Sequence, residues 1–188
     1  MKNPDYFFLR HGETAFNRAG VLHGQLDSKL TDLGISQAQE QGKFLKNLNL
    51  PDITVIYSSP LGRAVETAEI ITTFCSFEIR INPDLSEVMM GDWQGKTWDE
   101  ITIDDPELFF DNKTKFEISM LAPEGERYLD LSRRARRFLS NACTPSIIVS
   151  HGVMLNILRG ITCNLSFRQV SKLSQKQGEV FVVKSDGK

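Results

Sequence analysis

Five short apolar runs recur along the chain, and each has the length and composition of a β-strand. They cover Tyr6–Leu9, Ile53–Ser58, Phe77–Ile81, Ser146–Ser150 and Val180–Lys184. The second and fourth runs, ITVIYS and SIIVS, are β-branched and do not alternate between apolar and polar positions. This pattern is typical of parallel strands that are buried on both faces of a sheet.

Helical patterns fill the intervals between these strands. Thr31 is a suitable N-cap for a helix to about Leu48, and Ser59-Pro60 predicts the start of a second helix that ends near Phe74. Two more helices are expected, from about Glu124 to Ala142 and from about Val153 to Gly160. The first helix should place four apolar side chains near one face: Leu33, Ala38, Leu45 and Leu48. Strands that alternate with helices predict an α/β domain with a mostly parallel sheet.

One segment, residues 91–127, interrupts this alternation. It shows no regular pattern and carries ten acidic residues together with five aromatic ones: Trp93, Trp98, Phe109, Phe110 and Phe116. A long insertion in a compact domain is usually a lid or cover over a functional site. We therefore expect one domain over residues 1–188 with a lid-like insertion at about 91–127.

The size and charge of the chain argue against several classes of protein. A length of 188 residues favours one domain, and contents of 40% apolar and 24% charged residues are ordinary for a globular protein. The net charge of −2 gives no indication of binding to nucleic acid or to an anionic membrane. No apolar run approaches the roughly 20 residues that a membrane-spanning helix needs.

Cysteine and histidine usage indicates neither disulfides nor a metal site. Cys75, Cys143 and Cys163 are far apart, no CxxC pair occurs, and the three histidines lack metal-ligand spacing. We therefore expect no metal, and cysteines that act as small apolar side chains in a reducing compartment. The stretch MKNPDYFF lacks the long apolar segment of a signal peptide, so a cytoplasmic protein is expected.

Basic and polar side chains follow three of the predicted strands. Arg10-His11-Gly12 ends the first, Ser58-Ser59-Pro60 with Arg63 follows the second, and His151-Gly152 follows the fourth. In open α/β sheets, ligands bind beyond the carboxyl ends of the strands. Two arginines, two histidines and a helix N-terminus at one edge would form an anion site. Each cluster alone also fits a surface turn or a solvated helix, but their joint placement favours the anion site.

These clusters belong to a longer series of motifs. The series has five members, which are, in chain order, Arg10-His11-Gly12-Glu13-Thr14 with Asn17; Leu30-Thr31-x-x-Gly34; Ser58-Ser59-Pro60-Leu61-x-Arg63-Ala64 with Thr67-Ala68; Leu85-x-Glu87 with Gly91-Asp92-Trp93-x-Gly95; and Ser150-His151-Gly152. From about residue 10 to 160, the series resembles the signature of the histidine phosphatase superfamily, the phosphoglycerate mutase-like proteins. The resemblance implies a three-layer α/β/α domain of the phosphoglycerate mutase-like kind and no cofactor.

The resemblance also implies a covalent phosphohistidine mechanism. His11 would attack phosphorus, water would later hydrolyse the phosphohistidine, and five residues would hold the phosphoryl group: Arg10, Asn17, Arg63, His151 and Gly152. A neutral imidazole is a usable nucleophile near neutral pH. Two arginines nearly balance the charge of about −1.5 to −2 on a phosphate monoester, and His151 would stabilise charge in the transition state. Gly12 is expected to allow a ligand close to the backbone.

Glu87 would protonate the leaving oxygen, again by resemblance. Its apolar neighbours Leu85, Val88, Met89 and Met90 are expected to desolvate it, whereas the arginines of the pocket act in the opposite direction. His23-Gly24 falls where the family often has a Gln-Gly pair at the substrate mouth, so both residues are expected to bind substrate.

Two other stretches carry no site prediction. Gly125-Glu126-Arg127 stands where the family often has Gly-Glu-Ser, so the contacts of that serine do not transfer. The run Arg133-Arg134-x-Arg136-Arg137 is expected to be a solvated face of the third helix.

Fold and nucleophile do not by themselves separate a phosphatase from a mutase. Residues 91–127 contain only Lys96, Lys113 and Lys115 before Arg127 and lack the paired arginines of the family's mutases. GDWQGKT instead resembles the small phosphatase branch, which includes broad-specificity and ribazole phosphatases. The expected activity is metal-independent hydrolysis of phosphate monoesters of small metabolites. A mutase-type phosphotransferase, a phosphoprotein phosphatase and a non-catalytic phosphate-binding module stay open, as do the physiological substrate and a homodimeric state.

Overall fold

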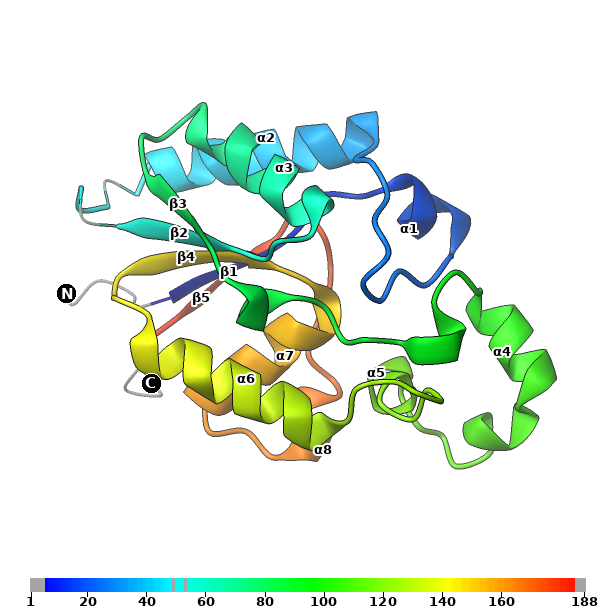
Figure 1. The fold of residues 1–188 in the computed structure, drawn as a ribbon. Coiled ribbons are helices and arrows are strands. Elements are labelled where there is room, and N and C mark those ends of the chain that lie inside the picture. Colours follow the sequence, from blue (N-terminus) through cyan, green and yellow to red (C-terminus); the bar gives the residue numbers. More distant parts are fainter. Residues whose placement is uncertain (1–5, 49, 53, 185–188) are drawn as a thin grey trace.

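A five-stranded sheet forms the centre of the computed structural model, which describes residues 6–48, 50–52 and 54–184. The strands are β1 (Tyr6–Arg10), β2 (Val55–Ser58), β3 (Glu78–Ile81), β4 (Ser146–Ser150) and β5 (Val180–Val183). Their order is β3-β2-β4-β1-β5 (Figure 1), with β5 antiparallel to β1 and the other pairs parallel. The predicted mostly parallel α/β fold is therefore confirmed, and all five strands lie where the apolar runs placed them, although Ile53 is outside the described residues.

Helices cover both faces of this sheet. In Figure 1, α2 (Asp32–Lys46) and α3 (Gly62–Thr72) lie above it, and α6 (Tyr128–Asn141) and α7 (Gly152–Thr162) lie below it. Four shorter helices complete the described part: α1 (Ala15–Ala19), α4 (Trp98–Asp104), α5 (Lys115–Ser119) and α8 (Phe167–Val170). Single 3-10 turns occur at Pro83–Leu85, Gly91–Trp93 and Pro106–Phe109. Every helix in the described residues is too short or too polar to cross a lipid bilayer.

Two apolar layers result, because successive strand residues point to opposite faces. One layer joins Phe7, Leu9, Ile56, Ile147 and Val149 to Leu45 of α2 and to Ala64, Ala68 and Ile71 of α3. The other joins Tyr6, Phe8, Val55, Tyr57 and Ile148 to residues of α6 and α7, among them Leu131, Phe138 and Met154. β2 and β4 are buried along their whole length, which confirms the interpretation of the two β-branched runs.

Helix α3 begins later than predicted. Its N-cap is Leu61, not Ser59, and the first helical residue is Gly62. The Ser59 hydroxyl lies 2.7 Å from Nε2 of His151 and accepts a hydrogen bond from the backbone N–H of Leu61. Ser59 is thus engaged at the carboxyl end of the sheet, and the chain turns into the helix only afterwards.

Two further helix predictions need correction. α6 begins at Tyr128, after the N-cap Arg127, and Glu124 is not part of it because its φ of 54° lies outside the right-handed helical region. In α2, Ala38 and Leu45 are buried, whereas Leu33 and Leu48 are exposed, so only part of the predicted apolar face meets the core. Cys143 is also exposed, in contrast to the apolar role expected of it.

The 91–127 insertion is not irregular, because it contains α4, α5 and two of the 3-10 turns. Figure 1 shows α4 and α5 to one side of the sheet, next to the loop that carries α1. A bridge between Val21 and Thr97 and a hydrogen bond from Leu22 N to Lys96 O (2.8 Å) join the two segments. Among its aromatic side chains, Trp93 and Phe116 are buried and Phe110 is exposed. The insertion therefore packs beside the carboxyl ends of β1, β2 and β4.

Candidate active site

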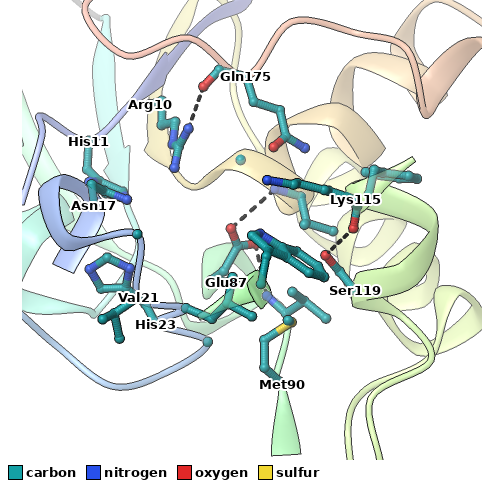
Figure 2. Close-up of a pocket in the computed structure, with 18 of the residues that line it drawn as sticks. Arg10, His11, Asn17, Val21, His23, Glu87, Met90, Lys115, Ser119 and Gln175 are labelled. Atoms are coloured by element: carbon teal, nitrogen blue, oxygen red, sulfur yellow. Dashed lines mark hydrogen bonds between the residues drawn. The ribbon is translucent and has the colours of Figure 1, made fainter. Parts of the chain in front are cut away.

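A cavity of about 260 Å³ opens where the carboxyl ends of the central strands face the insertion. Eight of the nine predicted site residues line it: Arg10, His11, Asn17, His23, Gly24, Arg63, Glu87 and Gly152. The ninth, His151, is fully buried, with its ring centroid 5.1 Å from that of His11. Figure 2 shows the labelled residues converging from the end of β1, the segment around α1, the segment that carries Glu87 and Met90, α5, and the connection between α8 and β5. The fold therefore brings together side chains that are far apart in the sequence.

The hydrogen bonds of His11 determine its tautomer. Its Nδ1 lies 2.8 Å from the carbonyl oxygen of Gly12, which can only accept, so Nδ1 carries the proton. Nε2 is then the basic nitrogen, and it accepts a hydrogen bond of 3.3 Å from Nε of Arg63. Burial, together with the charges of Arg10 and Arg63, holds the pKa of His11 well below its ordinary value. His11 is thus a neutral imidazole with its lone pair on Nε2.

Arg63 is held by the loop that precedes α2. Its Nη1 donates to Leu26 O (2.7 Å) and to Asp27 Oδ1 (3.2 Å), and its Nη2 donates to Gly24 O (3.0 Å). Only 1% of this side chain is exposed, so the charge is fixed beside His11. Gly24 contributes through its backbone: its φ is +51°, and a Cβ there would lie 2.3 Å from Oε1 of Gln94.

Two buried nitrogen atoms beside His11 lack partners among the described residues. They are Nε of Arg10 and Nδ1 of His151. The rest of the Arg10 guanidinium is anchored by Nη1, which donates to Gln175 O at 2.6 Å. Burial lowers the pKa of both groups, and neighbouring cationic or basic groups lower it further in His151. Buried polar atoms without partners are rare in native structures, and here they fit a site that an anion would complete.

Asn17 is oriented by three donors. Its Oδ1 accepts from Thr14 N (3.2 Å), Thr14 Oγ1 (3.1 Å) and Gln177 Nε2 (2.9 Å). With the oxygen engaged in this way, the Nδ2 amide is the group left to donate in the cavity. This geometry suits the predicted contact with a phosphoryl oxygen.

His23 lies at the side of the cavity. Its Nε2 is 2.7 Å from Oγ1 of Thr14, and its ring packs against Phe16. Burial, followed by the charge of Arg63, lowers the pKa of His23 to about 4. The side chain is therefore neutral at physiological pH and lines the cavity together with Gly24, as the sequence predicted for these two positions.

Glu87 is held by the amino terminus of α7. Its Oε1 accepts from Val88 N (2.9 Å) and Met154 N (3.2 Å), and its Oε2 accepts from Val153 N (3.2 Å). Of the predicted apolar neighbours, Leu85, Val88 and Met90 are buried, but Met89 is exposed. The expected apolar neighbours are therefore present except for Met89, and backbone N–H groups that the sequence did not indicate reach both carboxylate oxygens.

Gly12 and Gly152 allow close packing between protein segments. A Cβ on Gly12 would lie 2.3 Å from the carbonyl oxygen of Gly34, and the Gly12 N–H donates to Thr67 Oγ1 at 3.0 Å. On its Cβ side, Gly12 is therefore packed against the backbone of α2. A Cβ on Gly152 would lie 2.9 Å from Oε1 of Gln175 and at an ordinary contact distance of 3.6 Å from Cζ of Arg10, so this glycine leaves room for the side chain of Gln175.

Some cavity residues had no signal in the sequence. Gln175 comes from the connection between α8 and β5, and Lys115 and Ser119 come from α5. In the sequence, Lys115 is only one of three lysines in an acidic segment. Recognition of these positions needs the path of the chain, because their own neighbours in sequence carry no motif.

The buried imidazoles give the first testable prediction, which concerns stability at acid pH. His11, His23 and His151 are neutral in the folded protein, with pKa values below the unfolded value of about 6.5. Unfolding therefore takes up protons below pH 6.5, so stability is greatest above that pH and falls as the pH decreases toward 4. We expect Tm to fall by at least about 5 °C between pH 7.5 and pH 5.0 in thermal melts followed by circular dichroism.

The matched control is His23→Asn, which removes one of the three groups. The same carboxylates titrate in both proteins, so only the histidine contribution differs. The Tm of the variant should therefore fall less between pH 7.5 and pH 5.0 than the Tm of the wild type. An equal fall in Tm for the two proteins would contradict the contribution of His23 to the pH dependence of stability.

Comparisons with known proteins agree with this geometry. The sequence profile of the histidine phosphatase superfamily (branch 1) matches residues 6–188. The chain is 34% identical over 157 residues to the "Probable phosphoglycerate mutase GpmB" of Yersinia pestis (strain Pestoides F), which covers 81% of this chain and 71% of the relative.

Solved structures give the same result. A mycobacterial glucosyl-3-phosphoglycerate phosphatase in complex with VO3 has a TM-score of 0.79 and 26% identity, over 93% of this chain and 87% of that one. YhfR of Bacillus stearothermophilus has a TM-score of 0.77 and 31% identity, over 94% and 89% of the two chains.

Proposed function

Because the chain belongs to the histidine phosphatase superfamily, we propose that it hydrolyses phosphate monoesters of small metabolites through a phosphohistidine at His11. The observation that carries this proposal is the state of His11 Nε2, an unprotonated nitrogen at a cavity that Arg10, Asn17 and Arg63 also line. A neutral nucleophile surrounded by fixed donors is what in-line attack on a phosphate dianion requires.

The proposed reaction has two steps. In the first, Nε2 forms a bond to phosphorus, the ester P–O bond breaks, and the carboxyl group of Glu87 gives its proton to the leaving oxygen. In the second, the Glu87 carboxylate takes a proton from water, the oxygen of that water bonds to phosphorus, and the N–P bond breaks to release phosphate. Arg10 and Arg63 supply two positive charges to the phosphoryl group, so the mechanism requires no metal.

The outer part of the cavity supports a small substrate that carries a further anionic group. Lys115 lines the cavity, and its Nζ lies 5.5 Å from the centroid of the Trp98 ring. Within the described residues, no ion pair or hydrogen bond engages this ammonium group. A carboxylate or second phosphate on the substrate would pair with it. This observation also favours the second candidate, a mutase-type phosphotransferase, because such an enzyme must hold two anionic groups.

Product analysis separates these two functions. Purified protein would be incubated with a panel of monoesters, with and without a carboxylate or second phosphate, in the presence and absence of EDTA. We expect release of inorganic phosphate that EDTA does not inhibit, and higher kcat/KM for the monoesters that carry the extra anion. Parallel assays would follow interconversion of 2- and 3-phosphoglycerate. Efficient interconversion with negligible phosphate release would overturn the proposed phosphatase activity in favour of a mutase activity.

A further inference from the structure

Arg134 of α6 makes the most extensive side-chain contacts near Glu87. Its Nη1 donates to the carbonyl oxygens of Asp84 (2.7 Å) and Ser86 (2.6 Å), and its Nη2 donates to that of Glu87 (3.2 Å). The remaining donors pair with Glu126: Nε with Oε1 at 2.6 Å and Nη2 with Oε2 at 2.8 Å. All five N–H groups of the guanidinium are therefore used.

The segment that receives these donors is Asp84–Glu87, the loop that carries the predicted acid. Its remaining carbonyl, that of Leu85, accepts from Oγ of Ser150 at 2.7 Å, so side chains bind every carbonyl of the loop. The side chain of Glu87 points away from Arg134, and its carboxylate accepts hydrogen bonds from the N–H groups of Val153 and Met154 in the first turn of α7. The loop is thus held by α6 at its backbone and by α7 at its functional side chain.

Burial separates Arg134 from the other arginines of its run. The side chains of Arg134 and Glu126 are 11% and 17% exposed, whereas those of Arg133 and Arg137 are 74% and 64% exposed. The prediction of a solvated face therefore holds for Arg133 and Arg137 but was wrong for Arg134. Arg137 contacts the same loop, but only through the carboxylate of Asp84.

We propose that Arg134, paired with Glu126, is a positioning residue that sets the place of the Glu87 carboxyl group opposite His11. The inference rests on the proposed function, in which Glu87 transfers a proton. A lysine cannot replace the arginine, because one ammonium group has three donors and no planar fork to span three carbonyls and a carboxylate. The positive charge is kept by that substitution, so Glu126 does not lose its counterion.

The test compares Arg134→Lys with the matched control Arg137→Lys on two substrates. An alkyl phosphate depends on proton donation, and p-nitrophenyl phosphate depends on it little. Arg134→Lys should lower kcat at least about 10-fold for the alkyl ester and less than about threefold for the nitrophenyl ester. Arg137→Lys should stay within about twofold on both. When combined with Glu87→Gln, the Arg134 change should add little further loss, because both act on one step.

Hydrogen exchange gives a second readout that does not need turnover. The amides of Val153 and Met154 donate to Glu87, so their exchange should become faster in Arg134→Lys and stay unchanged in Arg137→Lys. If Arg134→Lys does not fold, Glu126→Gln releases the same guanidinium from its ion pair, and the same two readouts apply.

The two proposals fail in different ways. If the wild-type protein releases no phosphate from any monoester, but the Val153 amide exchanges faster in Arg134→Lys than in the wild type, only the proposed function is overturned. An active wild-type protein in which Arg134→Lys slows both esters equally, or leaves the α7 amides unchanged, overturns the positioning role.

Discussion

Replacing His11 with alanine will lower kcat for phosphate release by at least about three orders of magnitude, as expected for a nucleophile that acts in a coupled unit. The structure gives the reason: Nε2 of His11 is the unprotonated nitrogen, and Arg63 donates to it from a fixed position. The neighbouring imidazole of His151 is fully buried and does not line the cavity, and its Nε2 lies 2.7 Å from the Ser59 hydroxyl. Steady-state kinetics with p-nitrophenyl phosphate measure the loss.

His23→Ala is the matched control for this variant. It removes a second imidazole from the same cavity, with a ring centroid 6.1 Å from that of His11. We expect it to alter KM and to keep most of kcat. Rapid acid quenching of the wild-type protein with labelled substrate should trap acid-labile phosphate that His11→Ala does not form. Near-normal turnover by His11→Ala, or acid-stable label on a serine, would refute the phosphohistidine mechanism.

Glu87→Gln will slow poor leaving groups by roughly 10²- to 10⁴-fold and nitrophenolate much less. A nitrophenolate ion leaves without a proton, whereas an alkoxide does not. Glutamine keeps the size of the side chain and retains one acceptor for the N–H groups of Val88 and Met154, but it has no proton to give. The amide nitrogen cannot accept from Val153, so the Tm of the variant should be measured beside its rates.

Glu13→Gln removes the same charge from a neighbouring loop and provides the control. Glu13 accepts from Oγ1 of Thr31 and from Arg18, and it does not line the cavity. Its substitution should change the rates of hydrolysis of the alkyl and nitrophenyl esters by the same small factor. Equal losses for alkyl and nitrophenyl phosphates in Glu87→Gln would give Glu87 a structural role and leave the proton donor unassigned.

The amino-acid sequence by itself determined the sheet and eight of the residues that line the cavity, among them its histidines, its arginines and Glu87. The β-branched runs of β2 and β4 are short-range patterns, and burial on both faces follows from them directly. His11, Arg63 and Gly152 come directly or soon after strands, and parallel strands end at one edge, so their meeting could be predicted without coordinates. Glu87 and Asn17 were identified by motif, since no local periodicity marks them.

Only the tertiary structure decided the states and supports of these groups. The tautomer of His11 depends on the Gly12 carbonyl and on a guanidinium from another element. Arg134 looks like a solvated helix residue until the Asp84–Glu87 loop is placed beside it, and Lys115 looks like a surface cation until α5 reaches the cavity. The physical reason is the same in each case. Sequence periodicity reports which side of an element is apolar, whereas hydrogen-bond partners from distant segments are set by the path of the folded chain.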